Sequence, residues 1–212
     1  MCRAVSKEAT IAAIRLAAAA VILLGLSAQA WADLNYGTFT WSQLPVYFTP
    51  LAAIAGIAAF ICAAVAGPVE PRWVELLRVN AATYAVITGV VYWSLLAHYG
   101  HPRFPWANAI IHGGAAVMLV ADWVFVGQRH RLPWHTLWTV FAVPVLWLGY
   151  LAVYDAVTGW IPYRFLDPAR GMSTLIGTVM LMFAAGLLVV TALRWSTGLR
   201  VVSTKLVPAL AS

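Results

Sequence analysis

The stretch YFTPLAAIAGIAAFICAAVAG, residues 47–67, contains no charged residue. A helix needs roughly 20 mostly apolar residues to cross the hydrocarbon core of a bilayer. Residues 47–66 meet this requirement, and Gly67 followed by Pro68 ends the run with the usual signal for a helix break. The stretch therefore predicts a membrane-spanning helix.

Five further segments of the same kind lie on either side of it, at residues 10–30, 78–97, 106–126, 136–154 and 172–193. The 212 residues are 63% hydrophobic and 9% charged, whereas a soluble domain carries about 25% charged residues. The composition predicts an all-α, polytopic membrane bundle of six transmembrane helices, and residues 1–212 form a single integral-membrane domain.

The net charge of +6 reports membrane topology and does not indicate nucleic-acid binding, because basic residues mark the cytoplasmic loops of membrane proteins. If the N-terminus is cytoplasmic, only Arg103, Arg164 and Arg170 lie outside. The ten on or near the inner side are Arg3, Lys7, Arg15, Arg72, Arg78, Arg129, Arg131, Arg194, Arg200 and Lys205. We therefore expect both termini in the cytoplasm.

The first segment also has the features of a secretory signal peptide. Basic residues precede the apolar core LAAAAVILLGL, and SAQAWA supplies small residues before a possible cleavage after Ala32. Cleavage of residues 1–32 would leave five helices in the same orientation. We expect the segment to be retained.

Polar groups at membrane depth are expensive and are therefore functional candidates. Thr49 lies ~3 Å along the 47–66 helix and His112 roughly 9 Å along the 106–126 helix, at about 1.5 Å of rise per residue. Both fall in the outer leaflet. Asn108 precedes His112 by four residues, so it shares a helix face and could hydrogen-bond the imidazole. For Thr49, a bond to a backbone carbonyl or a neighbouring helix is the simpler interpretation. We expect Asp122 to pair with Arg129 and Arg131 at the interface.

The segment TGWIPYRFLDP, residues 158–168, is rich in aromatic residues and lies on the outer side in this topology. We expect it to form a lid in which Trp160, Tyr163 and Phe165 cover the mouth of a pocket. Asp167 could hold the lid by pairing with Arg164 or with a helix end. The aromatic residues are also typical of an interfacial belt.

Three motifs, VYFTPL, NAIIHGG and TGWIPYRFLD, resemble those of the androgen-induced-protein family of six-helix membrane proteins, which includes the androgen-dependent TFPI-regulating protein and bacterial relatives. The matching features are an aromatic-x-Thr, an Asn-x-x-x-His and a Tyr-x-Phe-Leu-acid sequence. The chain departs from the pattern at Ala52, Ala53, Gly113 and Arg164.

Vertebrate members of this family are threonine hydrolases of fatty acid esters of hydroxy fatty acids. The resemblance implies that Thr49 is the nucleophile and His112 its base, with Asn108 in support. It implies a lipid or fatty-acyl ester as substrate, no cofactor and a bacterial plasma membrane as location. A neutral His is the usual base for a hydroxyl nucleophile.

Two other classes of function stay open from the sequence. A non-catalytic membrane binding protein, or an accessory subunit with protein partners in the membrane, would need no water-accessible cavity joining Thr49 to His112. A metal or haem site would use His98, His101 and His112, but no Cys or carboxylate supports it. We expect no metal. A transporter is the least favoured class, because the predicted spans contain few charges and no repeated half is evident.

Overall fold

The computed structural model describes residues 7–37, 40–67, 69–126 and 132–197, with the exception of the side chain of Ser42. These residues form helices and connecting loops, with no strand among them. Six helices are long and apolar enough to cross a membrane. The prediction of an all-α bundle with six spanning helices is confirmed at this level.

The first three spans are α1 (Lys7–Tyr36), α2 (Phe48–Ala66) and α3 (Arg72–Val91), which continues as the π-helical turn η2 (Tyr92–Leu96). The short 3₁₀ helix η1 (Trp41–Val46) leads into α2. The fourth span joins α4 (Pro105–Ala109), the π-helical turn η3 (Ile110–Gly114) and α5 (Ala115–Phe125).

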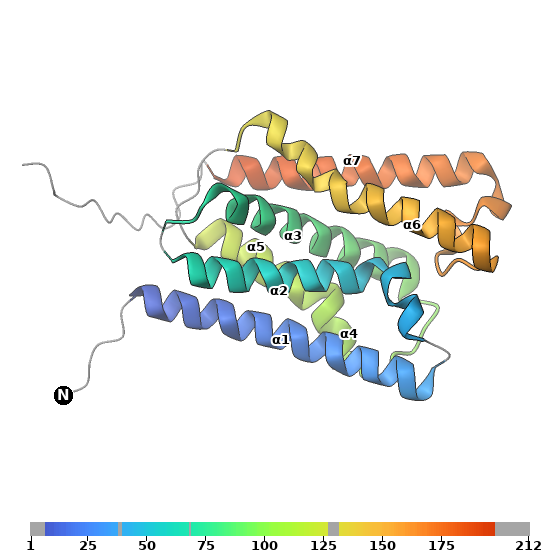
Figure 1. Ribbon diagram of the computed structural model, residues 1–212, viewed down its shortest axis with the longest axis horizontal. Coiled ribbons are helices and arrows are strands. Elements are labelled where there is room, and N and C mark those ends of the chain that lie inside the picture. The colour runs from blue at the N-terminus through green and yellow to red at the C-terminus, as the bar shows by residue number, and fades with distance from the viewer. Residues whose placement is uncertain (1–6, 38–39, 68, 127–131, 198–212) are drawn as a thin grey trace, which may run out of the picture.

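The fifth span joins the 3₁₀ helix η4 (Trp134–Phe141) to α6 (Ala142–Thr158). A loop with two 3₁₀ turns, η5 (Arg164–Leu166) and η6 (Pro168–Arg170), leads to α7 (Met172–Ser196). Helices α1 and α7 lie on opposite sides of the bundle, with α2, α3 and the fourth span between them (Figure 1). The start of α1 and the end of α7 lie at the same end.

Four buried charges hold the bundle together at this end. Arg15 of α1 contacts Glu70 at 2.8 Å and Asp122 at 2.9 Å. Arg78 of α3 contacts the same two carboxylates. Each of the four side chains is at most 9% exposed. Two positive and two negative charges thus balance inside the bundle, as buried ions require.

This cluster corrects two expectations. Asp122 pairs with Arg15 and Arg78 inside the bundle, whereas its expected partners, Arg129 and Arg131, lie outside the described residues. The third span begins at Arg72, six residues before the expected start at 78. The apolar-run criterion leaves out residues 72–77 because they include Arg72 and Glu75, whereas the helix begins directly after Pro71.

Candidate active site

Thr49 lies at the start of α2, as the second residue of the helix. Pro50 follows it without disturbing the helix, because amide groups in the first turn have no intrahelical partner in any case. α2 itself has no carbonyl four residues before Thr49, because the helix begins at Phe48, and the Thr49 hydroxyl contacts a neighbouring helix instead. The first turn is also the positive end of the helix dipole, which favours a developing negative charge.

The Thr49 hydroxyl contacts His112 of the fourth span, with Oγ1 and Nε2 3.2 Å apart. The other ring nitrogen, Nδ1, lies 3.1 Å from the backbone carbonyl of Asn108. A carbonyl only accepts hydrogen bonds, so Nδ1 carries the proton and Nε2 presents a lone pair to the Thr49 hydroxyl. This arrangement of nucleophile, base and orienting group suits general-base chemistry.

Asn108 supports the site differently from the expectation. Its backbone carbonyl, not its side chain, binds the imidazole. The side-chain amide donates a 2.8 Å hydrogen bond to the Tyr92 hydroxyl. The Tyr92 ring in turn stacks on the imidazole of His112, with the two ring centroids 3.8 Å apart. Asn108 therefore helps to hold Tyr92 against the histidine.

Sequence reasoning did not find Tyr92, because an aromatic residue near the end of a spanning helix is typical of the interfacial belt. Both Tyr92 and His112 lie in π-helical turns, η2 and η3. Such turns are rare in proteins, but those that occur frequently lie at functional sites. The indole N–H of Trp93 donates to the His112 carbonyl at 3.0 Å, which satisfies a backbone acceptor in this irregular turn.

The aromatic loop reaches the site through Tyr163. This side chain is 7% exposed, and its hydroxyl accepts a 3.0 Å hydrogen bond from the backbone N–H of Phe48, next to Thr49. Its own proton stays available to a further acceptor. Burial raises the pKa of the Tyr163 hydroxyl, so the group is neutral at physiological pH. Burial, reinforced by the charge of Asp33, also raises the pKa of Tyr47.

The other predicted lid residues, Trp160, Phe165 and Asp167, make different contacts. Trp160 packs edge-on against Tyr47 and Tyr154, and Phe165 packs against Tyr163. Asp167 forms no ion pair with Arg164 or with a residue of the site. Its carboxylate accepts from the backbone N–H of Ala169 at 2.9 Å and caps η6. Asp167 thus stabilises the loop, in which Tyr163 is buried and Trp160 is exposed.

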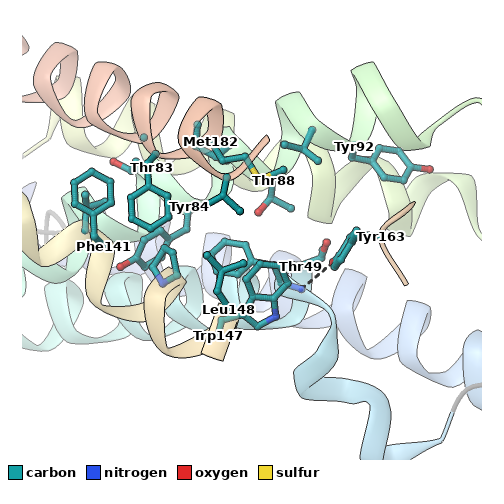
Figure 2. Close-up of a pocket in the computed structure, with 18 of the residues that line it drawn as sticks. Thr49, Thr83, Tyr84, Thr88, Tyr92, Phe141, Trp147, Leu148, Tyr163 and Met182 are labelled. Atoms are coloured by element: carbon teal, nitrogen blue, oxygen red, sulfur yellow. Dashed lines mark hydrogen bonds between the residues drawn. The ribbon is translucent and has the colours of Figure 1, made fainter. Parts of the chain in front are cut away.

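Two cavities meet at Thr49. We call the first the apolar cavity: about 100 Å³ between α3, α6 and α7. Figure 2 shows its lining, with Thr49 and Tyr163 close together at one end and Thr83 and Phe141 towards the other. Its wall is almost entirely hydrocarbon and aromatic, including Trp147, Leu148, Met182 and Phe183.

We call the second the vestibule: about 470 Å³ between α1, α2, the fourth span and the aromatic loop. Its lining includes His112, Asn108, His101, Trp160 and several polar side chains of α1 and η1. Four residues line both cavities, namely Thr49, Tyr92, Leu96 and Tyr163. The Thr49 hydroxyl therefore lies at the boundary between an apolar and a polar space.

The histidines considered for a metal site do not form one. His101 lines the vestibule and is exposed, as is His98. No three His, Cys, Asp or Glu side chains within the described ranges are placed to hold a metal ion. The arrangement instead offers a hydroxyl, an imidazole with a lone pair on Nε2, and a neutral phenol.

Comparisons with protein-family models, with curated proteins and with solved structures find no match for this chain.

Proposed function

We propose that this protein is an intramembrane threonine hydrolase of lipid carboxylic esters, with Thr49 as nucleophile and His112 as general base. The observation that carries the proposal is the Thr49–His112 contact at the boundary of the two cavities. The motif resemblance to hydrolases of fatty acid esters of hydroxy fatty acids supports the same residues. A non-catalytic subunit would not need a vestibule lined by both Thr49 and His112.

The first half of the reaction forms an acyl-enzyme. Oγ1 of Thr49 attacks the ester carbonyl carbon while Nε2 of His112 takes the hydroxyl proton. The tetrahedral intermediate collapses, the bond between the carbonyl carbon and the alcohol oxygen breaks, and His112 returns the proton to the leaving alcohol. An acyl-Thr49 ester remains.

The second half releases the acid. A water molecule from the vestibule gives its proton to His112 and attacks the acyl carbon. The bond to Thr49 breaks, and His112 returns the proton to Oγ1. The Tyr163 hydroxyl, fixed by the Phe48 amide, would donate to the oxyanion in both halves. Backbone amides in the first turn of α2 offer further donors.

In this proposal each cavity holds one half of the substrate. The acyl chain fits the apolar cavity, and the alcohol half fits the vestibule. The apolar cavity is smaller than the ~150 Å³ engineered cavity that holds benzene, so we propose a preference for short acyl chains. In the topology with both termini in the cytoplasm, as the basic residues favour, the site opens on the extracytoplasmic side of a bacterial plasma membrane.

The test uses purified protein in detergent, a fluorophosphonate probe and p-nitrophenyl butyrate. We expect wild type to be labelled and to hydrolyse the ester, with Thr49→Ala and His112→Ala each losing roughly 10³-fold or more in kcat/KM. Thr158→Ala is the matched control, since this hydroxyl bonds the Tyr154 carbonyl on the exposed end of α6. Mass spectrometry should place the adduct on Thr49.

Labelling that persists in folded Thr49→Ala would identify a different nucleophile and reject the mechanism. A folded wild type that neither reacts with the probe nor hydrolyses the ester would favour the non-catalytic alternative.

A further inference from the structure

One face of α1 forms a wall of the vestibule. The residues of α1 that line it are Leu26, Gln29, Ala30 and Asp33, which lie on one face of the helix, and Gly37 follows just after its end. The polar members, Gln29 and Asp33, lie one turn apart. This helix carries neither Thr49 nor His112, so it contributes to the vestibule without taking part in the proton transfers.

The two polar side chains of this wall form a fixed pair. The Gln29 amide donates to Asp33 through a 2.9 Å hydrogen bond between Nε2 and Oδ1. That bond orients the other amide atom, Oε1, which is buried and has no hydrogen-bond partner among the described residues. The Asp33 carboxylate lines the vestibule and can accept from hydroxyl donors there, and the Gln29 amide fixes its orientation.

The charges of the residues that line the vestibule also favour a ligand with hydroxyl donors. Asp33 is the carboxylate in its lining, and no Lys or Arg is present among the described residues that line it. Arg103, from the same end of the bundle, instead stacks on the ring of Tyr36, 4.5 Å from its centroid. An anionic group in the vestibule would thus face Asp33 without a lining cation to compensate, and like charges at close range repel.

We propose that the vestibule selects the alcohol half of the substrate for hydroxyl donors and against negative charge, with Gln29 and Asp33 as specificity-determining residues. The chemical class is a glyceryl-type ester, in which a polyol is the leaving alcohol. This inference rests on the proposed hydrolase function and narrows it, because a carboxylate close to the ester bond is disfavoured.

The test compares two butyryl esters that differ in one group. Glyceryl monobutyrate carries a terminal CH₂OH where the butyryl ester of glyceric acid carries a carboxylate. For wild type we expect kcat/KM to favour the glyceryl ester by roughly tenfold or more, from the repulsion at Asp33. Asp33→Asn should bring the two values within about threefold. Gln29→Leu, which keeps the size but removes the amide that orients Asp33, should weaken use of the glyceryl ester.

Asp155→Asn is the matched control, because it removes a carboxylate at the same end of the bundle that lines neither cavity. The preference should be unchanged in this variant. Equal use of the two esters by wild type, or a preference that survives in Asp33→Asn, would overturn the inference.

A binding measurement separates this inference from the proposed function. Saturation-transfer NMR with the folded Thr49→Ala variant should show stronger binding of the glyceryl ester, and Asp33→Asn in that background should remove the difference. Binding preference without Thr49-dependent hydrolysis would reject the hydrolase and retain the vestibule assignment. Thr49-dependent hydrolysis without preference, or no binding of either ester, would reject the vestibule assignment.

Discussion

Gly89 of α3 passes the backbone of His112 so closely that a Cβ at this position would lie 2.6 Å from the His112 carbonyl oxygen. Only a residue without a side chain allows this approach of α3 to η3. The same carbonyl accepts the Trp93 indole N–H, one turn further along the third span. The position of the candidate base therefore depends on the contact between two helices.

We predict that Gly89→Ala displaces η3 and with it His112. Overpacking of this kind costs about 1–3 kcal/mol of unfolding free energy, and a misplacement near 1 Å at the base would lower kcat of order 10²-fold. Gly149→Ala in α6 is the control, because open space surrounds its Cβ position and Ala favours the helix. Unfolding by SDS titration and ester hydrolysis measure both effects. Wild-type activity in Gly89→Ala would show that the close approach is not required.

The buried charge cluster should be essential for stability rather than for chemistry. Arg78→Gln leaves Glu70 and Asp122 with one cation instead of two, and breaking a buried ion pair costs about 3–5 kcal/mol. Arg72→Gln, the same change at an exposed position six residues earlier, should stay within about 0.5 kcal/mol of wild type. The measurement is the unfolding free energy in mixed micelles. Similar values for the two variants would contradict a structural role for the cluster.

The apolar cavity should determine the acyl chain length. A Cβ at Gly186 would lie 3.6 Å from Phe141, an ordinary contact, so Gly186→Ala should be tolerated. Gly186→Leu extends further into the cavity. We expect it to lower kcat/KM for a hexanoyl ester relative to an acetyl ester by roughly tenfold or more, since single methylene groups are discriminated at this level.

The control for the cavity is Gly177→Leu, nine residues earlier on α7, where the Cβ position is open and the residue is exposed. Its selectivity should equal that of wild type. If Gly186→Leu and Gly177→Leu have the same chain-length profile, the acyl chain lies elsewhere.

Tyr163 should contribute to stability in a pH-dependent way. Burial raises the pKa of its hydroxyl above the ordinary value of 10.0. Above that pH the unfolded state loses the proton first and binds fewer protons than the folded state, so the unfolding free energy falls as pH rises. The contribution is complete below pH 10 and is lost above it by up to about 1.4 kcal/mol per pH unit.

The measurement compares the alkaline slopes of unfolding free energy in wild type and Tyr163→Phe, and the variant should have the smaller slope. Tyr99→Phe, which alters an exposed tyrosine, serves as the control. Identical slopes in wild type and Tyr163→Phe would show that the folded hydroxyl titrates normally.

The sequence by itself determined the six spans and the polar residues among them, because the thickness of the hydrocarbon core sets the length of each apolar run. Thr49, His112 and Asn108 stood out because polar groups at that depth need partners. The charged start of the third span was not predicted, since a criterion of apolar run length excludes Arg72 and Glu75.

Only the tertiary structure decided which faces of these helices meet. Lipid-facing and core-facing side chains are both apolar in a membrane bundle, so the pattern along a helix does not encode its rotation or register. Three features depend on that rotation. Tyr92 stacks on His112, and Gly89 passes close to the His112 backbone. Gln29 and Asp33 line the vestibule. The sequence named a hydroxyl and an imidazole, and the packing of α2 against the fourth span set them 3.2 Å apart.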